Sequence, residues 1–582
     1  MNYTELIERN LNEEDTQVLK SIYAPTVVAV PPADATSSMC VTTDGEIRMF
    51  GLANRKHPDD PGTNVYMSSK NAGLSWETHI MKDQRAIGSA GYNPKTGRYM
   101  SIYPNGFRRD LLETFGKKGA WVIINNEGYE SSNSRYVKIS DERIHMLKQP
   151  MYLESCDRWL VLGQFREFDN LNTVIFISDD DGETWSQSVV KVAPRFEMKP
   201  PHKGERWYQG SLEPTIAELD DGSLLMIVRT SQDYHYKYYS YDKGTTWTDP
   251  EQTDFHGTNT MPVLYKLTDG RLLFFWCNTQ PMPELDHEKT YPPVDETVKT
   301  GIWEDVFTNR DANHLAISED DGKTWVGIRE LYLNQIRNNA DFRSIGGLET
   351  RDKSIHQAQM LELPFNKLLI SFGQNRSSRK TVILDIDWLY EKERYEDFRY
   401  GLENVSTQMY VHSNLGVFRG FSGHCAYNRT NGALLMPDPD ANYEEALQIC
   451  YLDDDRLVYK KQGAVWNYPA SKSGRVEVRL RVVGNGVSLC LTDHWYNPSD
   501  EVIKDEAHVR FDYCDKNTDG WDVIAFEYDL SEKKVKVFVN DVLTKEMAIT
   551  TEAPLGLSYL HIQTLANERD LDGTYIKSMK KY

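Results

Sequence analysis

The chain has 582 residues, 40% of them hydrophobic and 26% charged, which predicts a soluble globular protein with two domains or one large repeat array. Its formal net charge of -21 disfavours nucleic acid as a partner, because such a surface repels a polyanion at long range. The N-terminus is polar and acidic, and no stretch approaches the roughly 18 apolar residues of a membrane span, so we expect a cytoplasmic location and no membrane partner.

Helix-like patterns are scarce and lie mainly in an N-terminal segment, residues 1–24. Beyond it, four segments follow the pattern S-x-D/N-x-G-x-T/S-W, and their first residues are Ser69, Ser178, Ser240 and Ser318. The pattern is typical of a hairpin turn, since Asp or Asn folds back on its own backbone and glycine supplies a positive φ. We interpret these turns as the outer hairpins of β-propeller blades, with each tryptophan plugging its turn against the next blade.

The spacing of these turns sets the number of blades. Their starts are 109, 62 and 78 residues apart, and a four-stranded blade takes roughly 40–50 residues, so the widest gap holds a blade without the turn. A second element, a strand, a tight turn and another strand, recurs six times, with turns near residues 44–45, 93–97, 155–158, 221–222, 269–270 and 363–366. Six inner hairpins predict a six-bladed β-propeller over residues 25–395.

The pattern changes after the propeller. Alternating strands at 475–482, 487–491, 522–528 and 534–539 predict an antiparallel β-sandwich over residues 396–582. Its pattern resembles a lectin-like jelly roll of the concanavalin or laminin-G type, which either binds sugar or buttresses a catalytic domain; buttressing is favoured. The fold class is therefore all-β.

Neither a metal nor a cofactor is expected. The seven cysteines are widely spaced and form no CxxC pair, which argues against a disulfide framework and a structural zinc site. The Asp residues of the four turns lack the further oxygen ligands that a calcium loop needs.

The four turns resemble the Asp boxes (BNR repeats) of the sialidase superfamily, and one stretch sharpens the resemblance. Residues 213–229 contain a glutamate, a strand, a DG turn, a strand and an arginine in the spacing of sialidases, followed by an Asp box. The resemblance implies that Glu213 corresponds to the glutamate that tunes the nucleophile. It implies that Arg229 is one of three arginines that grip the substrate carboxylate, and that the chain is a glycosidase.

Two departures from the family stand in the sequence. The first inner strand reads Ala35-Thr-Ser-Ser-Met39, without the family's arginine, and the last reads Ser354-Ile-His-Gln-Ala-Gln359, without its tyrosine nucleophile. These departures indicate a divergent branch with another substrate or another route to hydrolysis.

The candidate site residues are expected near the propeller axis, each at the start of an inner strand or at the end of an inner hairpin. Besides Glu213 and Arg229, they are Arg55, Arg166, Asn259, Asn278, His356, Gln357 and Gln374. Glu213 is interpreted as an acid, a base or the partner of a nucleophile, and the alternative is a structural salt bridge with Arg229. Arg229 is interpreted as a bidentate carboxylate ligand. His356 is interpreted as a proton shuttle or, equally, as a hydrogen-bonded core residue.

Three loops add further candidates. Asp59 and Asp60 lie in a Pro/Gly loop, where a carboxylate can close over a sugar and protonate the leaving oxygen. The alternative is a plain turn, for which Asp, Pro and Gly are typical residues. Asp341 and Arg343 are expected in a loop over the pocket. Trp207 and Tyr208 could stack on a sugar ring or pack at the rim. Asp311 and His314 are weaker candidates.

Three functions remain open because a fold alone fixes no chemistry. The first hypothesis is an exo-acting glycoside hydrolase for a terminal, potentially acidic sugar of an oligosaccharide. The second is a lyase for uronate-containing glycans, with His356, Gln357 and Arg229 at its site. The third is a non-catalytic carbohydrate-binding protein. The expected partner is an oligosaccharide or glycan, and a homo-oligomer is an open alternative.

Overall fold

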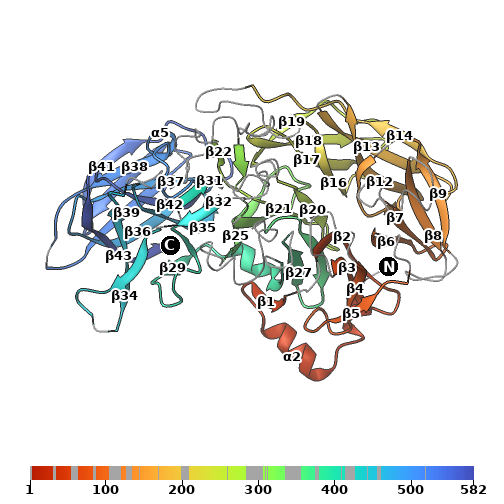
Figure 1. Cartoon of the computed structure of the whole chain (residues 1–582), viewed down its shortest axis with the longest axis horizontal. Coiled ribbons are helices and arrows are strands. Elements are labelled where there is room, and N and C mark those ends of the chain that lie inside the picture. The colour runs from red at the N-terminus through yellow and green to blue at the C-terminus, as the bar shows by residue number, and fades with distance from the viewer. Residues whose placement is uncertain are drawn as a thin grey trace.

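The structure is a computed structural model and describes part of the chain (Figure 1). The described residues are 3–30, 34–53, 63–82, 87–103, 119–125, 134–142, 144–167, 170–197, 209–257, 260–283, 306–308, 310, 312–334, 355–373, 379–407, 409–412, 427–430, 432–441, 443–454, 460–517 and 519–582. Among them, no helix is long and apolar enough to cross a membrane.

The chain begins with two short helices, α1 (Tyr3–Glu8) and α2 (Glu13–Ser21). The side chain of Asn12 caps α2 by accepting a hydrogen bond from the backbone N–H of Asp15 at 2.8 Å. Ile7 and Leu19 are fully buried and join the core between the first and last blades, so the helices cover the seam where the propeller closes.

The next residues form six successive antiparallel sheets, the blades of the predicted propeller (Figure 1). Blades one and two contain β2 (Asp34–Val41), β3 (Ile47–Ala53), β4 (Thr63–Ser69) and β5 (Glu77–Ile80), then β6 (Ile87–Asn93), β7 (Arg98–Tyr103), β8 (Ala120–Asn125) and β9 (Arg135–Ser140). Blade three contains β10 (Ile144–Leu147), β11 (Met151–Leu153), β12 (Arg158–Glu167), β13 (Asn170–Ser178) and β14 (Ser186–Val189), with β15 (Gln209–Gly210) added parallel to β13.

Blades four to six follow the same plan. Blade four contains β16 (Leu212–Glu218), β17 (Leu224–Arg229), β18 (Tyr234–Ser240) and β19 (Glu251–His256). Blade five contains β20 (Val263–Lys266), β21 (Leu272–Trp276), β24 (Ala312–Ser318) and β25 (Val326–Leu333), and a small ribbon of β22 (Pro281–Pro283) and β23 (Val306–Thr308) lies between β21 and β24 in the chain. Blade six contains β26 (Gln359–Leu363), β27 (Lys367–Phe372), β28 (Lys380–Asp385) and β1 (Thr26–Ala29).

The ring closes by pairing the two ends of the propeller. Strand β1 is the outermost strand of blade six, with Thr26 opposite Ile383. An N-terminal strand therefore completes a blade that the chain reaches last, which ties the two ends of the propeller together. The six predicted inner hairpins and the blade without an Asp box are confirmed.

The Asp boxes join the third and fourth strands of blades one, three, four and five. In blade three, Asp180 accepts hydrogen bonds from the Ser178 hydroxyl and the Thr184 backbone N–H, both at 2.8 Å, and Trp185 donates to the carbonyl of Gly182 at 3.1 Å. The expectation that each turn packs on the next blade is wrong. The turn glycines face the preceding blade, because a Cβ on Gly182 would lie 2.6 Å from Met100 of blade two.

A 3₁₀ helix, η3 (Ile386–Tyr390), links the propeller to a two-sheet sandwich. One sheet contains β29 (Arg394–Glu396), β33 (Leu434–Pro437), β34 (Glu445–Tyr451), β36 (Ser473–Val482), β39 (Asp522–Asp529), β40 (Lys534–Val539), β41 (Val542–Ala548) and β43 (Asp570–Lys581). The other contains β30 (Val405–Ser406), β35 (Gly463–Ser471), β37 (Val487–Thr492), β38 (Val509–Tyr513) and β42 (Leu557–Thr564), while β31 (Met409–His412) pairs with β32 (Tyr427–Thr430) and α5 (Ile503–Glu506) precedes β38. Apolar side chains of both sheets form one buried core, which confirms the predicted sandwich.

The sandwich packs against blade five through a buried polar interface. Strand β25 contacts β35, and Tyr559 of β42 donates to the Glu330 carboxylate at 3.0 Å. Trp495 exchanges backbone hydrogen bonds with Asn278 at 3.0 Å and Gln280 at 2.7 Å. These contacts dock the sandwich on blade five of the propeller (Figure 1).

Candidate active site

Glu213 occupies a strained position on the inner strand of blade four. The pairing of β16 with β17 shifts between Leu212 and Thr215, and Glu213 has a φ of 47°, which is rare for a residue with a side chain. Its backbone N–H donates to the Oε1 atom of Gln164 at 2.9 Å. Such strain in a non-glycine residue is characteristic of functional sites, where the surrounding structure holds it in place.

Glu213 and Arg229 form a buried ion pair. Nη1 of Arg229 donates to Oε2 of Glu213 at 2.9 Å, and the two side chains are only 5% and 7% exposed. Burial alone would raise the pKa of Glu213, but the charges of Arg229, Lys148 and Arg310 outweigh it and lower that pKa. Glu213 is therefore ionised at neutral pH.

Lys148 brings a second cation to this carboxylate from blade three. It lies between β10 and β11, which both pair with β12, so it interrupts the inner strand much as Glu213 does in blade four. Its Nζ atom lies 2.7 Å from the sulfur of Met261. Burial lowers the pKa of Lys148 to about 8, against the opposing effect of Glu213.

Blade five and the start of blade six add Arg310 and His356, both buried. The carbonyl of Arg310 accepts a hydrogen bond from the Ile355 N–H at 2.9 Å, and Asn313 donates to the Ile355 carbonyl at 2.9 Å. The carbonyl of His356 accepts from the Gly373 N–H at 2.9 Å. These bonds hold His356 next to the segment that carries Arg310, while Gln357 is half-buried with a φ of 60°.

His235 lies behind the ion pair, next to the end of β17. Its Nδ1 atom is 3.2 Å from the carbonyl of Val228, and burial lowers its pKa to about 4. A neutral His235 adds no charge, so the charged groups that act on Glu213 are Arg229, Lys148 and Arg310. Buried cations gathered at one place are suited to hold an anionic group.

The structure describes two of the other predicted site residues, Arg166 and Asn278. Arg166 is exposed near the end of β12, opposite Leu171. Asn278 is buried and donates to the carbonyl of Asp493 in the sandwich at 2.8 Å, while its own N–H donates to Nδ1 of His314 at 3.0 Å. The remaining predicted site residues lie outside the described residues: Arg55, Asp59, Asp60, Trp207, Tyr208, Asn259, Asp341, Arg343 and Gln374.

The sequence analysis missed Lys148, Gln164 and Arg310. A signal for Lys148 was present, because Lys148-Gln149-Pro150 places a charged side chain shortly before a proline at an inner strand, as Glu213-Pro214 does. Arg310 directly precedes the weaker candidate Asp311, but no local pattern distinguishes it from a surface arginine.

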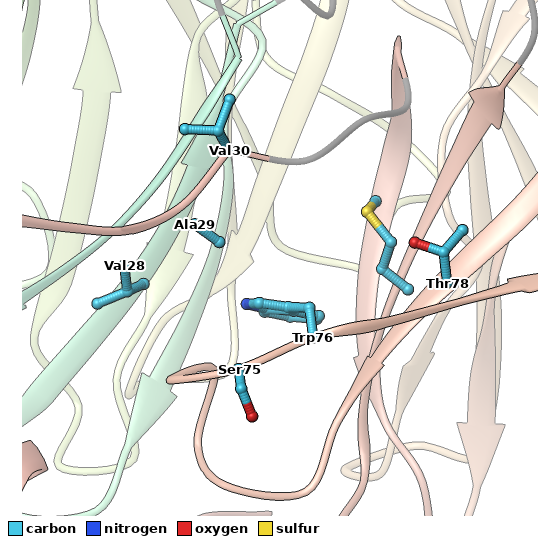
Figure 2. A pocket seen from close by; sticks show the side chains of 7 residues that line it. Val28, Ala29, Val30, Ser75, Trp76 and Thr78 are labelled. Carbon is cyan, nitrogen blue, oxygen red and sulfur yellow. The ribbon is translucent and has the colours of Figure 1, made fainter.

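A groove lies apart from this charged cluster, between β1 and the Asp box of blade one (Figure 2). It is lined mainly by apolar side chains: Val28, Ala29, Val30, Met67, Ser75, Trp76 and Thr78. None of the candidate site residues lines it, so it offers no chemistry to the site.

Comparisons with known proteins agree with the repeat architecture. The family model described as BNR repeat-like domain matches residues 115–356. Together with the six blades, this match confirms the predicted propeller of Asp boxes (BNR repeats). No curated protein sequence matches the chain.

Several solved structures are similar to the chain at low sequence identity. A protein of unknown function from Dyadobacter fermentans is 16% identical with a TM-score of 0.40, covering 62% of this chain and 98% of its own. A Trypanosoma rangeli sialidase is 12% identical with a TM-score of 0.36, covering 97% and 91%. The NanB sialidase of Streptococcus pneumoniae is 12% identical with a TM-score of 0.38, covering 65% and 73%. At these values the likeness carries no argument about substrate or activity.

Proposed function

We propose that this protein is an exo-acting glycoside hydrolase that takes a terminal sugar bearing a carboxylate. The observation that carries the proposal is the buried Glu213 carboxylate held among Arg229, Lys148 and Arg310. Arg229, Lys148 and Arg310 act on this carboxylate from three different blades, and cations gathered in this way are suited to bind a substrate carboxylate as well. The family likeness of residues 115–356 is in keeping with a sugar substrate.

Arg229 and Lys148 have different tasks in this proposal. Arg229 is a permanently charged planar fork, suited to a carboxylate, although its Nη1 already donates to Glu213. Lys148 is a compact charge whose pKa of about 8 keeps it mostly protonated at neutral pH. In this proposal, Lys148 supplies a cation to a carboxylate-binding site that lacks, in blade one, the arginine found in sialidases.

The ionisation of Glu213 limits its chemical role. Because its pKa is lowered, Glu213 is ionised at neutral pH and holds no proton to donate, which leaves it the roles of base, nucleophile or stabiliser of an oxocarbenium-like transition state. The proton for the leaving oxygen then comes from another group, for which Asp59 and Asp60 remain the predicted donors. His356, one residue from the Arg310-bonded Ile355, is the alternative proton carrier.

The test is a screen of the purified full chain against chromogenic α-sialosides, β-glucuronides and matched neutral glycosides. The wild type is expected to release the chromophore from one acidic class. Glu213→Gln should lower kcat/KM by about 10² to 10⁴, the usual weight of a positioned acid or base. Glu218→Gln is the matched control, since Glu218 lies at the far end of the same strand and pairs with Lys243 at 2.6 Å.

The screen can also contradict the proposal. Turnover of neutral glycosides alone, or full activity in Glu213→Gln, would overturn it. Binding of acidic sugars without any turnover would instead indicate the carbohydrate-binding protein.

A lyase is the second candidate, and Lys148 favours it. A lyase needs a base to remove a proton beside a uronate whose carboxylate is neutralised by cations. An amine with a pKa near 8 beside two arginines meets both needs. An unsaturated product, detected by its ultraviolet absorbance after incubation with uronate-containing oligosaccharides, distinguishes the lyase from the hydrolase.

A further inference from the structure

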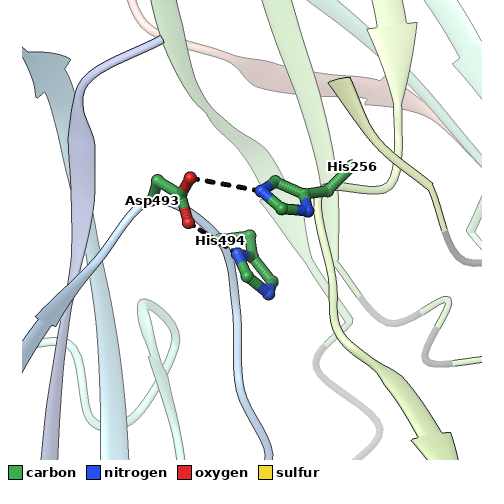
Figure 3. A group of neighbouring side chains, drawn as sticks. All are labelled: His256, Asp493 and His494. Carbon is green, nitrogen blue, oxygen red and sulfur yellow. Dashed lines mark hydrogen bonds and ion pairs between the residues drawn. The ribbon is translucent and has the colours of Figure 1, made fainter. Parts of the chain in front are cut away.

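Three side chains with metal-binding chemistry meet where the sandwich contacts blade four. His256 ends β19 of the propeller, whereas Asp493 and His494 follow β37 of the sandwich. Nε2 of His256 lies 3.1 Å from Oδ2 of Asp493, and Nδ1 of His494 lies 2.6 Å from Oδ1 of the same carboxylate (Figure 3). The carboxylate thus lies between two imidazoles from different domains.

We propose that His256, Asp493 and His494 bind one divalent transition-metal ion of the zinc class, and that this ion ties the sandwich to blade four. Two imidazole nitrogens and one carboxylate oxygen are a donor set that such ions prefer. The proposal stands independently of the enzymatic function, because none of these residues belongs to the Glu213 cluster.

The spacing of the donor atoms suits a small ion. One donor atom from each residue can be chosen so that all three lie within 4.8 Å of one another. With metal–ligand bonds of about 2.0–2.2 Å, the corners of a tetrahedral site lie roughly 3.4 Å apart. The distance of 3.1 Å between Nε2 of His256 and Oδ2 of Asp493 is close to that spacing. Nδ1 of His494 lies 2.6 Å from Oδ1 of Asp493 and would need to move away by less than about 1 Å.

The ligands are held in place by their surroundings. The Asp493 carbonyl accepts hydrogen bonds from Asn278 at 2.8 Å and from the Ser558 hydroxyl at 2.9 Å, which fixes the segment between the two domains. The rings of His256 and His494 stack with centroids 3.9 Å apart. Preorganised ligands of this kind lower the ordering cost of binding.

A fourth group borders the site. Nε2 of His508 lies 3.2 Å from Oδ1 of Asp493, and its Nδ1 lies 2.6 Å from the Thr551 hydroxyl, so His508 can serve as a further ligand or orient the carboxylate.

The test uses the untagged full chain after chelator treatment, titrated with CoCl₂ and with ZnCl₂. One equivalent of Co²⁺ should bind with the visible d–d bands of a nitrogen-ligated site, and Zn²⁺ should displace it and raise the melting temperature. Asp493→Asn and His494→Gln should abolish the bands, and His508→Gln should weaken binding by about 10- to 100-fold. His79→Gln is the control, since His79 hydrogen-bonds Ser68 in blade one, away from the cluster.

Two results would overturn the proposal. The first is a wild-type chain that binds no stoichiometric Co²⁺, in which case three imidazole N–H groups simply donate to Asp493. The second is unchanged Co²⁺ binding in Asp493→Asn. The wild-type titration stands on its own if a variant fails to fold, and neither result bears on glycoside turnover.

Discussion

Replacing Arg229 with methionine should leave the Glu213 carboxylate buried without its nearest cation. The pair is joined at 2.9 Å, and the two side chains are 5% and 7% exposed, so water cannot take over the role of the guanidinium. Breaking a buried pair by removing one partner costs about 3–5 kcal/mol. Lys148 and Arg310 remain near Glu213, so we expect the lower end, about 3 kcal/mol.

The pH dependence of this cost follows from the pKa of Glu213. In the wild type the folded-state pKa is lowered, so the ion pair stabilises the fold above the unfolded-state pKa, and this contribution is lost as pH falls through the folded-state pKa. In Arg229→Met, fewer cations oppose the effect of burial on Glu213, so the folded-state pKa of Glu213 is higher than in the wild type. The difference in the free energy of unfolding between wild type and variant should therefore shrink from pH 7 to pH 4.

The assay is urea unfolding followed by tryptophan fluorescence at several pH values. Arg229→Lys keeps a charge and should cost less than Arg229→Met. The double variant Glu213→Gln/Arg229→Met removes the stranded carboxylate and should regain at least about 1 kcal/mol, a coupling expected of residues in contact. A cost below about 1 kcal/mol at pH 7, or a cost equal at pH 4 and pH 7, would refute the reasoning.

Three further predictions concern other parts of the chain. For an acidic substrate, KM should rise as pH passes about 8, because Lys148 loses its proton there. In Lys148→Arg, a profile of KM against pH should show this rise at higher pH. Tyr559→Phe should cost about 1–3 kcal/mol in urea unfolding and expose the domain junction to limited proteolysis, because Glu330 loses a buried donor. Gly182→Ala should lower the melting temperature more than Gly97→Ala, since both glycines have a positive φ but only Gly182 meets neighbouring atoms.

Each of these predictions has a control or a contradicting result. A KM that does not change as pH passes 8 would show that Lys148 does not bind the substrate anion. Tyr582→Phe is the matched control for Tyr559→Phe, since it removes an exposed hydrogen bond to Glu477 and should cost little. Equal losses in Gly182→Ala and Gly97→Ala would show that backbone conformation alone, and not packing on blade two, makes the Asp-box glycine necessary.

The architecture could be predicted because its signals are local. An Asp box or a DG turn specifies its own hairpin through hydrogen bonds within a few residues, as Asp180 does with Ser178 and Thr184. Repeating such hairpins leaves few ways to pack them. The direction of packing was mispredicted because the turn's sequence does not reveal which neighbouring blade its glycine faces.

The candidate site could be predicted only in part. Glu213 and Arg229 lie on one hairpin, so their pairing follows from strand register. Lys148 and Arg310 act on the same carboxylate only when the ring closes. The proline that follows Lys148 is a weak local signal for it, whereas no local pattern marks Arg310. Asn278 was expected to face the axis but is bonded to the sandwich, because the sequence does not specify where a second domain docks.

The most direct test of the central claim is calorimetric titration of the Glu213→Gln protein with N-acetylneuraminic acid, glucuronic acid and the matched neutral sugars. We expect that an acidic sugar binds and that its neutral counterpart does not. Adding Lys148→Gln or Arg310→Met should weaken the binding at least about tenfold, as expected when a charged hydrogen bond of about 1.5–3 kcal/mol is lost. Equal affinity for acidic and neutral sugars, or binding indifferent to both added substitutions, would contradict it.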